Sequence, residues 1–258
     1  VRPDSIEKVI AFHWHNIEQA MRDAELSGRF DALVLAAGDA AQQTRYQQLC
    51  TLLAASDYAA ERITRKPAAF LALLESGTLE HAYATGALAQ RLREVLSDCS
   101  DEKDLMTRLR LFRHEQMLRI LWRDLNRLGA LPEIMQDLTD LADASIDESL
   151  SLLYPWTAAV FGTPLTAEGQ PMPMVVFAMG KHGARELNLS SDIDLMFAFA
   201  HEGDTHGATR SITHQEFFIK LGQKLIKALN ENTADGFVFR VDMRLRPYGD
   251  AGALALSF

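Results

Sequence analysis

The sequence is poor in cysteine, in positive charge and in long apolar runs, and each deficit excludes a class of protein. Its 258 residues include only two cysteines, Cys50 and Cys99, at neither a redox nor a metal-ligand spacing, so we expect reduced thiols and a cytoplasmic protein. No segment reaches the roughly 18 apolar residues of a membrane span, and the N-terminus lacks a signal-peptide core. The formal charge of −9 disfavours non-specific nucleic-acid binding, which needs a cationic surface. A protein partner or a small nucleotide is therefore the more plausible ligand.

Residues 1–165 are predicted to form an all-helical domain. Apolar side chains between residues 6 and 21 recur at the spacing of an amphipathic helix. Further helices are predicted over 40–55, 67–74, 79–96, 102–128 and from about 132 to beyond 150, with Pro155 bending or ending the last one. The arginines of the fourth of these helices are spread around several faces, which predicts a solvated or partner-facing surface: Arg108, Arg110, Arg113, Arg119, Arg123 and Arg127.

Residues 166–258 are predicted to form a second domain of α/β or α+β type. A segment rich in proline and glycine, residues 162–173, has linker composition and marks the boundary. Strand-like runs follow at 174–179, 193–200, 237–245 and 253–258, and a helix is predicted to begin at the capping box of Thr213 and Glu216. Because the chain stops directly after the last run, we expect this domain to be truncated at its C-terminus.

Three aspartates on these strands are the candidate centre of chemistry. Side chains alternate along a strand, so Asp192 and Asp194 should project to one side while Ile193 projects to the other. In the third run, Asp242 shares a face with Arg240, and the apolar residues from Phe237 to Leu245 form the opposite face.

If these strands are neighbours, three carboxylates converge and repel one another unless cations lie between them. Magnesium prefers such hard oxygen ligands and binds one or two carboxylates together with substrate phosphates. A pair of such ions, about 4 Å apart, stabilises the attacking and leaving oxygens in phosphoryl transfer. The alternative is structural: Asp192 is a turn residue, and Asp194 and Asp242 merely face solvent.

Two long segments resemble a known family. They are MGKHGARELNLSSDIDLMF (residues 179–197) and GFVFRVDMRLRPYGDAGALALSF (residues 236–258). Both are similar to the glutamine synthetase adenylyltransferase/adenylyl-removing enzyme family of the DNA polymerase β-like nucleotidyltransferases, and the resemblance extends less sharply through the helical region. The family pattern usually reads GKLGGREL, so His182 and Ala184 are departures. Because alanine takes positive φ less readily than glycine, we expect altered backbone geometry in this turn.

The resemblance implies an α+β fold, with a helical domain followed by a nucleotidyltransferase-type mixed sheet and flanking helices. It also implies an activity, the phosphorolytic removal of AMP from a tyrosine of glutamine synthetase with release of ADP. Arg240 and Met243 make the RVDMRLRP segment more similar to the family's N-terminal, adenylyl-removing copy than to its attaching copy. The implied partners are glutamine synthetase, orthophosphate, AMP, ADP or ATP, and the PII signalling protein, with no nucleic acid and no membrane.

By the same resemblance, Asp192, Asp194 and Asp242 are assigned to catalysis and to two Mg²⁺ ions, with Mn²⁺ as the alternative metal. The implied nucleotide- and phosphate-binding residues are Gly180, Lys181, Gly183, Ser191, Arg244 and Arg246. For the two arginines, an ion pair that holds Asp242 or its loop is an equally good interpretation.

Two other functions stay open at the level of sequence. One is the forward reaction, ATP-dependent adenylylation of the same tyrosine, which needs the same carboxylates and a base for the phenol. The other is a non-catalytic docking domain for glutamine synthetase or PII. The presence of all three aspartates argues against a vestigial site.

Overall fold

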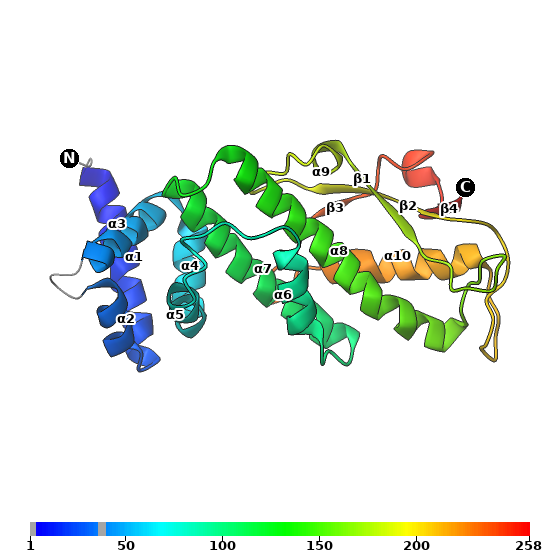
Figure 1. Ribbon diagram of the computed structural model, residues 1–258, viewed down its shortest axis with the longest axis horizontal. Helices are drawn as coiled ribbons and strands as arrows, with labels where there is room; N and C mark the ends of the chain where they lie inside the picture. The colour runs from blue at the N-terminus through cyan, green and yellow to red at the C-terminus, as the bar shows by residue number, and fades with distance from the viewer. Residues whose placement is uncertain (1–3, 36–39) are drawn as a thin grey trace. The chain divides into compact units, whose positions relative to one another are not determined.

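The computed structural model describes residues 4–35 and 40–258 and has the predicted α+β fold, a helical region followed by a mixed sheet with flanking helices (Figure 1). Contacts divide the chain into two compact units, the first made of Val1–Ala84 and His114–Asp137 and the second of Thr85–Arg113 and Leu138–Phe258. Helices α7 (Glu102–Leu125) and α8 (Leu131–Phe161) contribute residues to both units. Among the helices in the described ranges, none is long and apolar enough to cross a membrane.

The first unit contains only helices in its described part. They are α1 (Asp4–Asp23), α2 (Ser27–Val34), α3 (Ala40–Ala55), α4 (Asp57–Arg65) and α5 (Pro67–Glu75), together with the parts of α7 and α8 that belong to this unit. Ile17, Leu53, Ile63 and Leu71 are fully buried between them, and the Ser56 hydroxyl caps α4 by accepting from the amide of Ala59. The predicted helices at 40–55 and 67–74 are thereby confirmed.

Three arginines of α7 are buried, so the prediction that the α7 arginines form a solvated surface is wrong for Arg110, Arg119 and Arg123. In the first unit, Arg119 donates to Asp137 at 2.6 Å and to two backbone carbonyls. Arg123 likewise donates to Glu133 at 2.6 Å and to carbonyls. The charge pattern could not predict this, because the carbonyls that satisfy a buried guanidinium come from distant segments.

The second unit is built around β2 (Ile193–Phe199). Strand β1 (Val175–Met179) pairs with it antiparallel. On the other edge of β2, β3 (Val241–Asp242) pairs with its beginning and β4 (Ala255–Ser257) with its end, both parallel. This mixed sheet is the one expected. The unit also contains α6 (Ala87–Leu96), the single turn α9 (Gly180–Gly183), α10 (His214–Asn230) and the short 3₁₀ turn Gly249–Ala251.

Helix α10 packs on one face of the sheet (Figure 1). It begins at Thr213 with the predicted capping box, and its Phe218 stacks on Phe199 of β2 with ring centroids 4.9 Å apart. Gly222 faces the ring of Phe197, and an added Cβ would lie 2.7 Å from that ring. The missing side chain therefore allows α10 to approach the sheet closely. The polar residues described below lie on the face of the sheet that α10 does not cover.

Several predicted boundaries are wrong. The third strand was expected over 237–245 but has only two residues, because Val238 and Phe239 are both buried and both donate to the carbonyl of Leu229 instead of following an alternating ladder. The helix expected over 79–96 begins only at residue 87, after Gly86 with φ +80°. Helix α8 runs through Pro155 to residue 161, so of the two predicted effects of Pro155 the helix end is wrong; Leu153 and Thr157 on either side of it are fully buried.

Candidate functional site

Strand β2 presents two carboxylates on its exposed face. Ile193 and Leu195 are fully buried, whereas Asp194 between them is half-buried and Asp192 is exposed. This is the alternation that a strand over these residues predicts. The apolar residues anchor the strand in the core, so the position of Asp194 is fixed by the packing of its neighbours.

Strand β3 places Asp242 beside Asp194. The two residues are register partners on adjacent parallel strands, which run about 4.8 Å apart, so their side chains share a face. Partial burial together with the charges of Asp242 and Asp192 raises the pKa of Asp194 above its ordinary value, and Arg244 and His182 act in the opposite direction. The raised pKa is the electrostatic consequence of carboxylates gathered at one spot.

The turn α9 lies directly against Asp194. Gly180 has φ +54°, and a Cβ at this position would lie only 2.5 Å from Oδ2 of Asp194. At Gly183 a Cβ would lie 2.5 Å from the carbonyl oxygen of Ala178. Both glycines are therefore required by close approach. Ala184 has φ −79°, so the expectation that this alanine alters the turn is wrong, and the positive φ falls on Arg185 instead.

Arginines hold the other two aspartates. Arg240 donates from Nε to Asp192 and from Nη2 to the carbonyl of Ser190 at 2.6 Å. Arg244 donates to Asp242 from its backbone amide and its Nε, each at 2.8 Å, and these bonds lower the pKa of Asp242. The sequence resemblance gives Arg240 no role in the site beyond distinguishing the two family copies. Its place on the same predicted face as Asp242 was the signal that it belongs to the site.

The remaining predicted residues lie around these carboxylates with other contacts. Lys181 is exposed on α9. Ser191 exchanges hydrogen bonds with Asn188, donating to its Oδ1 at 2.9 Å and accepting from its amide at 3.0 Å. Arg246 donates to the carbonyl of Met243 at 2.7 Å and thus braces the loop after β3. Ser191 and Arg246 shape the loops that border the site.

The donor chemistry fits magnesium at Asp194 and Asp242. Both offer hard carboxylate oxygens from register partners, and Mg²⁺ binds one or two carboxylates with substrate phosphates and water completing its shell. Asp192 is engaged by Arg240 and Asp242 by Arg244, and within the described stretches no three acidic, histidine or cysteine side chains gather closely enough to hold a metal ion. The structure thus brings together a pair of carboxylates, with the third one beside it.

Comparison with known proteins identifies the family of the chain. The family model described as glutamate-ammonia ligase adenylyltransferase matches residues 46–258. The chain belongs to this family. It is 52% identical over 229 residues, 88% of its length, to the bifunctional glutamine synthetase adenylyltransferase/adenylyl-removing enzyme of Pseudomonas aeruginosa. It is 54% identical over 82% of its length to the protein of the same name from Pseudomonas putida, and 39% identical over 99% of its length to that of Shewanella loihica.

In these members of the glutamate-ammonia ligase adenylyltransferase family, the matched region is one part of a longer protein. The chain spans 22–25% of the length of these relatives. The match includes both segments that contain the aspartates, since residues 179–197 and 236–258 lie within residues 46–258. The names of these relatives give two opposed activities, adenylyl transfer to glutamine synthetase and adenylyl removal.

Proposed function

We propose that this chain is the adenylyl-removing nucleotidyltransferase part of such an enzyme and acts in the cytoplasm. The substrate is glutamine synthetase carrying AMP on a tyrosine. An oxygen of orthophosphate attacks the phosphorus of AMP, the bond from phosphorus to the tyrosine oxygen breaks, the phenolate takes a proton, and the products are tyrosine and ADP. The observation that carries the proposal is the register pair of Asp194 and Asp242 with Gly180 packed against it.

The chain's own residues have separable tasks in this reaction. Asp194 and Asp242 would hold Mg²⁺, or Mn²⁺ in its place, and the metal would neutralise phosphate oxygens when bound. Lys181 is exposed beside Gly180 and adds positive charge for the incoming phosphate. Orthophosphate is already anionic near neutral pH, so charge neutralisation matters more than a general base. Arg240 holds Asp192 at the rim of the site.

The removal reaction is preferred over attachment because Arg240 and Met243 make the RVDMRLRP segment similar to the removing copy of the family. Attachment from ATP requires a group that takes the phenolic proton of the acceptor tyrosine. The names of the relatives include both activities, so both must be measured. A docking role for PII is a further outcome, which a binding measurement with PII detects.

The test uses the 258-residue chain with Mg²⁺ in two incubations. In the first, adenylylated glutamine synthetase and orthophosphate should yield ADP. In the second, unmodified synthetase and ATP should yield no AMP-protein. Incorporation of AMP would assign the attaching activity, and binding of synthetase or PII without either product would assign a docking domain.

The carboxylates are tested by Asp194→Asn and Asp242→Asn. Each should reduce ADP release at least about 100-fold, equivalent to roughly 2.7 kcal/mol of transition-state stabilisation, while the circular dichroism spectrum is unchanged. Asp204→Asn is the matched control, because this aspartate is exposed in the same unit and follows the C-terminal end of β2, whereas Asp194 lies near the N-terminal end of that strand. Full turnover by Asp194→Asn would reject the proposed site.

A further inference from the structure

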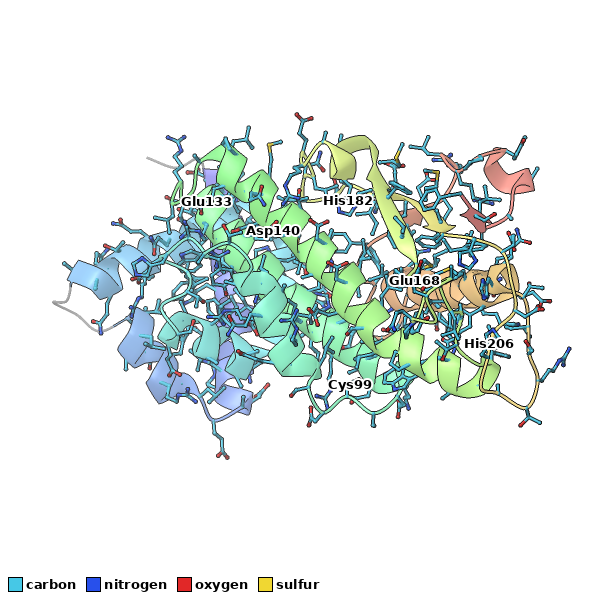
Figure 2. All side chains as sticks on the ribbon, turned by 45° about the vertical axis from the view of Figure 1, so that its right-hand side comes forward. Cys99, Glu133, Asp140, Glu168, His182 and His206 are labelled. Carbon is cyan, nitrogen blue, oxygen red and sulfur yellow. The ribbon has the colours of Figure 1, made fainter. Side chains whose placement is uncertain are left out.

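A buried histidine lies in the turn that touches Asp194. His182, within α9, is 2% exposed, and its Nε2 lies 2.7 Å from Oδ1 of Asp143 on α8 (Figure 2). Burial acts to raise the pKa of Asp143, but the hydrogen bonds from His182 and Arg185 outweigh it and hold that pKa below its ordinary value. Asp143 is therefore an acceptor only, and Nε2 of His182 must carry the hydrogen.

A second side chain, that of Arg185 two residues after α9, also reaches α8. Arg185 donates to Oδ2 of Asp143 at 3.1 Å and to Oδ1 of Asp140 at 2.5 Å. Asp140 and Asp143 are three residues apart and therefore lie on one face of α8. Figure 2 labels Asp140 and His182 where α8 and α9 lie side by side. His182 and Arg185 thus bind two carboxylates, Asp140 and Asp143, on one face of α8.

Burying His182 costs free energy that burying an apolar side chain of similar size would not cost. Its Nδ1 is buried and has no hydrogen-bond partner among the described residues. Burying a polar atom without a partner is unfavourable, because the atom loses its hydrogen bonds to water. A leucine would fill similar space without that cost. The bond from Nε2 to Asp143 is the contact that distinguishes histidine from leucine here.

We propose that His182 is a positioning residue, which ties the β1–α9 turn to Asp143 of α8 and so keeps Gly180 against the Asp194 carboxylate. Two contacts meet in this turn: Gly180 touches Asp194 on one side, and His182 binds α8 on the other. Loss of the bond to α8 frees the turn to move away from Asp194. The inference depends on the proposed function only for its Mn²⁺ binding measurement.

Three backbone hydrogen bonds inside the turn provide a direct readout. The amides of Ala184, Arg185 and Glu186 donate to the carbonyls of residues 180, 182 and 181 at 3.1, 3.0 and 2.8 Å. Their hydrogen exchange, measured by NMR on the full chain without substrate, reports opening of the turn. In His182→Leu and in Asp143→Ala, exchange at these three amides should be about tenfold faster than in the unchanged chain.

Two further variants separate positioning from general destabilisation. His182→Gln places an amide donor near the former Nε2 and should restore slow exchange. Arg93→Gln is the matched control: it removes another ion pair to α8, the 2.6 Å bond to buried Glu148, which is remote from α9 in sequence. It should lower the melting temperature and leave exchange in the turn unchanged. The double variant of His182→Leu and Asp143→Ala should exchange no faster than the faster single variant.

A binding measurement connects the turn to the carboxylates. Titration with Mn²⁺, followed by its paramagnetic broadening of signals from residues 193–195, should give a weaker apparent affinity, about threefold or more, in His182→Leu but not in Arg93→Gln. Unchanged exchange in both His182→Leu and Asp143→Ala would overturn the positioning role, whatever the activity. Faster exchange together with full turnover by Asp194→Asn would instead leave the positioning role standing and reject the proposed function.

Discussion

Asp194 and Asp242 occupy paired positions on neighbouring strands, yet they are held in different ways. Asp194 lies in a seven-residue strand with buried residues on both sides, and the backbone of Gly180 packs against its carboxylate. Asp242 lies in a two-residue strand, and its carboxylate is bound by Arg244. One carboxylate is positioned by backbone packing and the other by a charged side chain.

The difference predicts that the two halves of the site respond to different perturbations. A strand fixed by buried neighbours is insensitive to salt, whereas an exposed ion pair is screened. The short strand also depends on whatever fixes the loop before it. Arg110 fixes this loop. It is fully buried in the second unit and donates to the carbonyls of Gly236, Ala228 and Glu231.

The largest effect is expected from Arg110→Met. The substitution removes three hydrogen bonds to carbonyls at the end of α10 and in the following loop, of which the bond to Ala228 is fully buried, at a cost of about 3 kcal/mol in the free energy of unfolding. Urea denaturation should show this loss, and the amides of Val238 and Phe239, which donate to Leu229, should lose protection from exchange. Arg110→Lys keeps the charge but has fewer hydrogen-bond donors, so its free energy of unfolding should lie between those of Arg110→Met and the unchanged chain.

A matched control for this prediction is Arg119→Met in the first unit. Arg119 is equally buried but is paired with Asp137. Its loss leaves that buried carboxylate without its partner and also costs roughly 3 kcal/mol or more in the free energy of unfolding. It should not affect exchange at Val238 and Phe239. If Arg110→Met changed stability by less than about 1 kcal/mol, the idea that buried carbonyl contacts fix the approach to β3 would be wrong.

An intermediate effect is expected from Gly180→Ala. Alanine at φ +54° is strained by about 1 kcal/mol, and its Cβ would press on Asp194 at 2.5 Å. Gly169→Ala is the control, since Gly169 has φ +75° with no atom within 4 Å of an added Cβ. Gly169→Ala should lose stability through backbone strain alone, and Gly180→Ala should lose at least as much in thermal melts. Only Gly180→Ala should reduce ADP release or Mn²⁺ binding, and equal effects of both variants on these readouts would contradict the close contact.

The sequence was sufficient for the parts of the site that depend on local periodicity. The alternation around Asp194, the capping box at Thr213 and the glycine turn all follow from residues close together in the chain. The mixed sheet agreed with the family resemblance. These features need no knowledge of distant contacts, because strand pleating, capping and steric access act over a few residues.

The features that sequence analysis missed depend on contacts between distant segments. The alternating apolar pattern of residues 237–245 favoured a long strand, but Val238 and Phe239 bind Leu229 and leave the ladder. The buried state of Arg110 could not be inferred, because its carbonyl partners lie more than 100 residues away. Local patterns do not specify such partners, and tertiary packing overrode propensity in both cases.

The smallest effect is expected from Arg244→Gln, which sharpens the contrast between the two aspartates. The side-chain bond from Arg244, with a smaller contribution from its backbone amide, lowers the pKa of Asp242 from its ordinary value of 3.8. Because the folded-state pKa lies below the unfolded one, the contribution to stability is complete above the unfolded pKa and disappears as the pH falls through the folded pKa. The pH range in which this contribution to stability is lost therefore lies at and below pH 3.8.

Since the Arg244 side chain is 75% exposed, solvent screening should limit the stability loss in Arg244→Gln to less than about 1 kcal/mol. Carboxyl NMR titration should show the pKa of Asp242 rising in this variant, with a larger difference at 10 mM than at about 1 M salt. The pKa of Asp194 should rise slightly as well, because Arg244 is among the charges that lower it. An Asp242 titration that is independent of both Arg244 and salt would mean that its carboxylate, like that of Asp194, is held by the backbone.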